Sequence, residues 1–234
     1  MRDPRRYNVA VPTTLGILGT AASAALVAPW IGGGVGYAVS AVVIDAATLA
    51  VLVGIAGRQH PHARFGAANG VTTARVGLVA LAGALIGLDA GRRGLWMAVV
   101  LASVAAGLDG LDGWLARRAG LASEFGARFD METDALLILV LSILVWQHDK
   151  AGAWVLGCGL MRYAFMAAGL VLPSLARPLR STRRGKTVAV VQVVGLTVAL
   201  APIVSAPLSA VVAAVALAAL VWSFAVDTLW LVRQ

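Results

Sequence analysis

Residues 109–134 read DGLDGWLARRAGLASEFGARFDMETD, a stretch with four aspartates at spacings that suit α-helices. Asp109 and Asp112 stand three residues apart, and Asp130 and Asp134 stand four residues apart, so each pair shares one helix face. A short turn between the two helices would bring all four carboxylates to one place. Apolar segments of membrane length flank the stretch, and carboxylates at membrane depth are costly, so we expect a functional site here.

The composition is that of a membrane protein. Hydrophobic residues make up 60% of the chain and charged residues 13%, and the mean hydropathy is +0.86. Most of the apolar segments approach the roughly 20 residues that a helix needs to cross a bilayer, and no strand-like alternation recurs. Eight such segments are predicted, at residues 9–30, 35–57, 70–89, 94–115, 128–147, 151–172, 187–204 and 207–232. The sequence therefore predicts an all-α, polytopic transmembrane helix bundle.

The basic residues predict the orientation of the helices. Most of the 19 lysines and arginines fall on one side of the membrane, whereas the other side has only Arg92, Arg93 and Lys150. The positive-inside rule then places both termini and the aspartates on the cytoplasmic side of the cell membrane. The net charge of +8 follows from this asymmetry and from attraction to anionic membrane lipids, so no nucleic-acid partner is needed to explain it.

The first hydrophobic segment has two interpretations. Its basic start, its apolar run and the small residues at 21–25 also fit a secretory signal peptide. Because the apolar run continues to Trp30 and another span follows, we expect a retained helix, with a cleaved one as the alternative.

The four aspartates predict a metal centre. Clustered carboxylates cannot all ionise without compensation, and an oxygen-only ligand set suits hard cations such as Mg²⁺ or Mn²⁺. The only cysteine, Cys158, stands alone in another segment, so a soft metal is not expected. A cluster of this size has room for two ions, the arrangement used in phosphoryl transfer.

At these positions the chain resembles the CDP-alcohol phosphotransferase family. All eight fixed positions of its signature, D-x-x-D-G-x-x-A-R-x8-G-x-x-x-D-x-x-x-D, are present. Upstream, Asn69, Thr72 and Arg75 are similar to the N-x-x-T-x-x-R that opens the family's first core helix, and the likeness spans residues 66–232. A charge-paired polar cluster without catalysis is the alternative to an active site.

The resemblance divides the chain into three parts. Residues 68–234 would form a six-helix catalytic core, and residues 1–57 would add two N-terminal transmembrane helices outside it. The polar and basic segment at 58–67 would lie along the membrane surface between them. The resemblance also implies a homodimer.

The resemblance further implies a reaction and the roles of the aspartates. An alcohol hydroxyl attacks a CDP-linked donor, CDP-diacylglycerol in most membrane members, and CMP is released as a phosphodiester forms. Asp109, Asp112 and Asp130 match metal ligands, and Asp134 matches the general base and also stands among the metal ligands. Six further residues would contact the nucleotide or the donor: Asn69, Thr72, Gly113, Ala116, Arg117 and Gly126. For the first two, helix capping is an equally good explanation.

The residues that would bind a small polar acceptor alcohol are less clearly marked. Residues 177–186, RPLRSTRRGK, hold five cations that either bind an acceptor phosphate or only satisfy the positive-inside rule. Arg184 and Lys186 lie nearest the next hydrophobic segment and are the better candidates. Arg162 is either a pocket cation or a snorkelling arginine. We favour a phosphorylated acceptor.

Three other functions compete with this one. An enzyme of the same family would use a soluble CDP-alcohol donor. A secondary transporter would also place acids among helices, but it would not need the full signature. A silent membrane scaffold would be free to lose signature positions, yet all of them are present.

Overall fold

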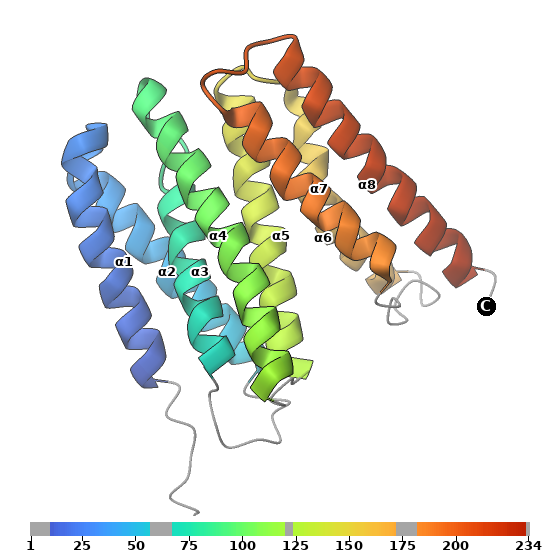
Figure 1. The fold of residues 1–234 in the computed structure, drawn as a ribbon, viewed down its shortest axis with the longest axis horizontal. Coiled ribbons are helices and arrows are strands. Elements are labelled where there is room, and N and C mark those ends of the chain that lie inside the picture. The colour runs from blue at the N-terminus through green and yellow to red at the C-terminus, as the bar shows by residue number, and fades with distance from the viewer. Residues whose placement is uncertain (1–9, 57–66, 120–123, 172–181, 233–234) are drawn as a thin grey trace, which may run out of the picture. The chain divides into compact units, whose positions relative to one another are not determined.

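The structure is a computed structural model that describes residues 10–56, 67–119, 124–171 and 182–232 (Figure 1). These residues form α-helices and one 3-10 helix, with no strand among them. The elements are α1 (Ala10–Ile31), α2 (Gly34–Ala56), α3 (Ala67–Gly83), α4 (Gly91–Ala119), α5 (Glu124–Gln147), η1 (Ala153–Val155), α6 (Leu156–Val171), α7 (Arg183–Leu200) and α8 (Leu208–Val232). Each α-helix corresponds to one predicted hydrophobic segment, so the all-α prediction is confirmed.

Five helical stretches among the described residues are long and apolar enough to cross a membrane. They lie in α1, α2, α4, the η1–α6 stretch and α8. α3 contains a shorter apolar helix, and α5 carries Asp130, Glu132 and Asp134 near its start. The length and composition of the helices are those of a multi-pass membrane protein.

Two helix boundaries differ from the predicted segments. The helix predicted at 70–89 is shorter, because α3 gives way to a turn through Gly87, whose φ of +79° is open to glycine without steric cost. In contrast, α4 runs beyond its apolar part to Ala119. Asp109 and Asp112 therefore stand on one unbroken helix, as their spacing predicts.

The chain folds as two compact units, residues 1–133 and 134–234, and α5 passes from the first into the second. In the first unit α3 packs against α1, α2 and α4. Leu49 of α2, Val76 of α3 and Phe129 of α5 form a buried apolar cluster. This cluster anchors the start of α5, directly before the second pair of aspartates.

Glycines allow α1 and α3 to approach each other closely. A Cβ atom at Gly16 of α1 would lie 2.6 Å from Cγ2 of Thr73, and one at Gly77 of α3 would lie 2.5 Å from Oγ1 of Thr20. Small residues at helix crossings are the usual means by which membrane helices pack. Because a larger side chain at either glycine would push the helices apart, these contacts fix α3 against α1.

At one end of the first unit, the end of α1 contacts the start of α4 and turns into α2. Gly32, with a φ of +73°, stands in the short turn between α1 and α2. Nη1 of Arg93, near the start of α4, donates a hydrogen bond to the carbonyl of Trp30, near the end of α1, at 3.2 Å. Since α4 starts at this end, Asp109 lies toward the opposite end of the unit.

In the second unit α7 packs against α8. A Cβ atom at Gly195 would lie 3.2 Å from Cβ of Ala216, and Nε2 of the buried Gln192 donates to the Ala216 carbonyl. Lys150, after α5, donates from Nζ to the carbonyl of Ala201 at 3.1 Å, where α7 ends. The side-chain donors of Gln192 and Lys150 thus contribute to the packing of this unit.

Candidate active site

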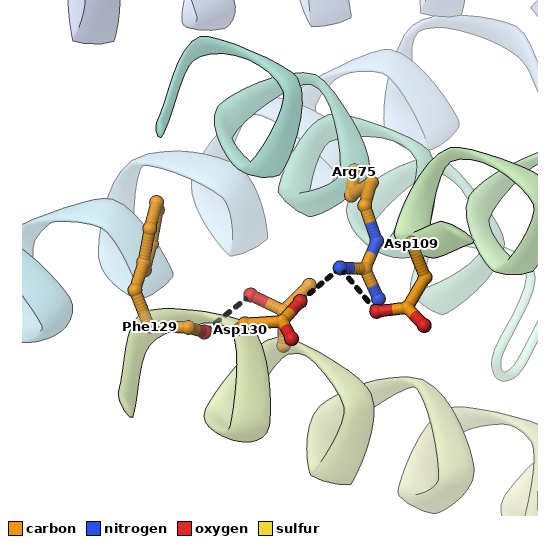
Figure 2. A network of polar contacts seen from close by, with 5 residues as sticks. Arg75, Asp109, Phe129 and Asp130 are labelled. Atoms are coloured by element: carbon orange, nitrogen blue, oxygen red, sulfur yellow. Dashed lines mark hydrogen bonds and ion pairs between the residues drawn. The ribbon is translucent and has the colours of Figure 1, made fainter. Parts of the chain in front are cut away.

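Arg75 of α3 joins two aspartates of the signature (Figure 2). Its side chain is only 1% exposed. Nη1 lies 2.9 Å from Oδ1 of Asp109 on α4, and the same nitrogen donates to Oδ1 of Asp130 on α5. One guanidinium nitrogen therefore ties three helices of the first unit together at the level of the aspartates.

Three of the four predicted aspartates come together. Asp109, Asp130 and Asp134 each offer a carboxylate oxygen, and these oxygens lie within 4.8 Å of one another. Asp134 follows Asp130 by about one turn of α5, so helix geometry brings both to the same face. All three side chains are half-buried. Asp112 stands on α4, but its side chain lies outside those that the structure describes.

Buried neighbours set the rotation of α5 at this point. Phe129 is 3% exposed and belongs to the apolar cluster, and Thr133 is 1% exposed. The Thr133 hydroxyl donates to the Phe129 carbonyl at 2.9 Å, within the helix. Because Phe129 and Thr133 turn inward, the adjacent Asp130 and Asp134 are left at the half-buried boundary.

The geometry of the three carboxylates fits a hard divalent cation. Oxygens bound to one ion lie at most about 4.2 Å apart for Mg²⁺, whose bonds are about 2.1 Å long, and at most about 5 Å apart for Ca²⁺, whose bonds reach about 2.6 Å. One carboxylate oxygen from each of Asp109, Asp130 and Asp134 lies within 4.8 Å of the others, so the three could share one metal ion after at most a small movement of their side chains. The donors are carboxylates alone, the ligand type that Mg²⁺ and Mn²⁺ prefer.

The structure describes two of the residues predicted to contact the nucleotide. Thr72 is buried on α3, about one turn before Arg75, and Gly126 is half-buried on α5, about one turn before Asp130. Both therefore lie on the helices that carry the network of Figure 2. The other four belong to α3 and α4, but their side chains are outside the described ones: Asn69, Gly113, Ala116 and Arg117.

The residues predicted to bind the acceptor lie in the second unit. Arg184 at the start of α7 forms an ion pair with Asp227 of α8, and its guanidinium carbon lies 5.7 Å from the centroid of the Trp222 ring. Lys186 is exposed, and Arg162 of α6 is half-buried. Arg184 thus joins α7 to α8, whereas Lys186 presents its charge to the surroundings.

Sequence reasoning assigned no role to Arg75. Its signal in the sequence is a cation within an apolar helix, where a charged side chain is expensive and usually functional. What the sequence does not contain is the identity of its partners, because Asp109 and Asp130 come from two other helices.

Apolar helices with converging carboxylates are what the family resemblance predicts for the catalytic core. In agreement with this, the family model for CDP-alcohol phosphatidyltransferases matches residues 65–224, which is more than half of the chain. The chain belongs to this family, and α1 and α2 precede the matched region. No solved structure matches the chain.

Proposed function

We propose that the chain is an integral membrane transferase of phospholipid biosynthesis. It moves the phosphatidyl group of CDP-diacylglycerol to the hydroxyl of a small polar alcohol and releases CMP. One observation carries this proposal: the carboxylates of Asp109, Asp130 and Asp134 converge, in a chain whose family is that of CDP-alcohol phosphatidyltransferases.

The aspartates would hold the metal. Asp109, Asp130 and Asp134, together with Asp112 of the same signature, would bind Mg²⁺ or Mn²⁺, as two ions. Bound there, the ions supply neutralisation of the diphosphate and of the leaving group. The oxygen-only donor set and the convergence of its three described carboxylates support this assignment.

Asp134 would act as the general base. Its carboxylate accepts the proton of the acceptor hydroxyl, and the hydroxyl oxygen forms a bond to the phosphorus that carries the diacylglycerol. The bond from that phosphorus to the CMP oxygen breaks, and CMP leaves with the electron pair. Asp134 is half-buried and stands one turn after Asp130, which places its carboxylate beside the proposed metal ligands, where the acceptor hydroxyl would have to bind.

The rest of the signature would bind the donor. Gly113, Ala116 and Gly126 are small enough to let cytidine approach the helix backbones. Arg117 would contact the diphosphate, as guanidinium groups commonly do. Thr72 and Asn69 would add polar contacts from α3, which also carries Arg75. The acyl chains of the donor would remain among the membrane lipids.

The acceptor would carry a phosphate and would bind near the start of α7. Lys186 is exposed and is the best candidate for a contact with that phosphate. Arg184 shares its charge with Asp227, so it has less to offer an incoming anion. Arg162, half-buried on α6, would complete the set.

The active site would face the cytoplasm of the cell membrane, in a homodimer. The positive-inside rule supports this orientation. The few cations assigned to the other side include Arg93, which lies at the end of the first unit where α4 starts, away from Asp109.

Release of CMP by the purified protein tests this function. CDP-diacylglycerol and Mg²⁺ are supplied with inositol phosphate, glycerol phosphate, serine, inositol or choline in turn. We expect release that depends on one acceptor and on the metal, and that Asp109→Asn abolishes. Asp89→Asn is the matched control, because Asp89 is an exposed acid in the connection between α3 and α4.

The negative outcomes separate the competing functions. CMP release from a soluble CDP-alcohol with diacylglycerol, and none from CDP-diacylglycerol, would move the protein to the soluble-donor class. No CMP release from either donor by folded protein would leave transport or a scaffold role.

A further inference from the structure

Arg75 stands where a cation is costly. It lies in the apolar part of α3 with its side chain 1% exposed. A buried charge is tolerated only when opposite charges compensate it. Here the compensation comes from Asp109 and Asp130, both of which contact the same guanidinium nitrogen (Figure 2).

The same two carboxylates belong to the candidate metal centre. Asp109 and Asp130 therefore form ion pairs with one cation, the guanidinium, and would also bind a second, the divalent ion. Nη1 of Arg75 lies 2.9 Å from Oδ1 of Asp109, so an ion that draws on this carboxylate comes within a few ångströms of the guanidinium charge. Like charges at such a separation repel each other strongly when partly buried.

The backbone of α3 cannot relieve this conflict by moving. Val76, next to Arg75, is fully buried in the cluster with Leu49 and Phe129. One residue further, Gly77 leaves no room for even a Cβ atom beside Thr20. The Arg75 side chain, which is long and carries five donors, can therefore adjust more easily than the α3 backbone.

We infer that Arg75 is the resident counter-cation of the aspartate cluster and competes with the divalent ion for Asp109 and Asp130. The guanidinium neutralises the two carboxylates and holds α3 to α4 and α5. When an ion binds, Arg75 gives up part of these contacts. The inference rests on the proposed metal site, and it names the residue that sets the affinity of that site.

Binding of Mn²⁺ alone, without substrate, tests the competition. The affinity of the full-length protein in detergent is measured by titration with detection of free Mn²⁺ by electron paramagnetic resonance. Arg75→Met, which keeps much of the length but not the charge, should bind Mn²⁺ about tenfold more tightly or better, the ratio expected for one lost charge-assisted contact. Arg93→Met removes the same net charge at an exposed position at the start of α4, and its affinity should stay within about twofold of the wild type.

The Mn²⁺ titration is repeated with Arg75→Gln, which is neutral but polar. This variant replaces Arg75→Met in the test if the methionine variant does not fold. As a second readout, both Arg75 variants should unfold at a lower temperature than the wild type in EDTA and gain more from saturating Mn²⁺, because a tighter ligand stabilises more. Equal or weaker Mn²⁺ affinity in the folded variants would overturn the competition and leave the metal site in place. Failure of the wild type and the variants alike to bind Mn²⁺ would overturn the metal site and this inference with it.

Discussion

The substitution Asp130→Asn tests how much the ion pair between Arg75 and Asp130 contributes to the stability of the protein without metal. Asparagine keeps an oxygen that can accept the hydrogen bond from Nη1, but it removes a charge that compensates the buried guanidinium. Loss of one partner from a fully buried pair costs about 3–5 kcal/mol. Because Asp130 is 36% exposed and Asp109 remains 2.9 Å from the same nitrogen, we expect about 1–2 kcal/mol, near the value of one charge-assisted hydrogen bond.

For a chain of this length that cost corresponds to a fall of about 2–8 °C in the midpoint of thermal unfolding. The midpoint is measured in EDTA, so that no metal contributes, with Asp89→Asn as the exposed control. The double variant with Arg75→Met should show a coupling energy of about 1 kcal/mol between the two sites. A midpoint equal to that of the wild type, or additive effects of the two substitutions, would refute the reasoning.

Three other substitutions probe different parts of the molecule. Asp134→Asn should lower turnover by about 10²–10⁴-fold, as for a lost general base, with a smaller loss of Mn²⁺ affinity than Asp109→Asn; near-normal CMP release would remove Asp134 from the mechanism. Leu49→Ala should cost about 2–5 kcal/mol by opening a cavity in the cluster that anchors α5, whereas Val43→Ala, at a position 59% exposed, should leave the thermal midpoint nearly unchanged. Lys186→Gln should raise the KM for a phosphorylated acceptor more than the KM for the donor, and an unchanged acceptor KM would argue against the phosphate pocket.

The number and order of the helices could be predicted from the sequence, because an apolar run of membrane length has hardly any alternative to a helix. The ends of the helices could not be predicted as well. Hydropathy alone ends the fourth segment at residue 115, before Arg117 and Arg118, yet α4 continues through both arginines to Ala119. The turn after α3 depends on which of several glycines adopts a positive φ, and the structure selects Gly87 and Gly91.

The aspartates of the site could also be predicted, since their spacing along α4 and α5 is a local property. Ion pairs between distant helices are not local. Arg184 is an attractive candidate for a phosphate pocket when the basic stretch before α7 is considered alone, but it pairs with Asp227 at the other end of the second unit's sequence. The partners of Arg75 could not be predicted from the sequence for the same reason, because each comes from a separate helix.

The two N-terminal helices bear on the site although the family match begins after them. α2 contributes Leu49 to the buried cluster, and the other two members of that cluster are Val76 and Phe129. Val76 directly follows Arg75 and Phe129 directly precedes Asp130, so Leu49 of α2 packs against a neighbour of each member of that ion pair. A change in the packing of α2 at Leu49 would therefore act on the immediate neighbours of both members of the ion pair. Through Leu49, α2 thus supports the residues beside the ion pair although it precedes the region that the family model matches.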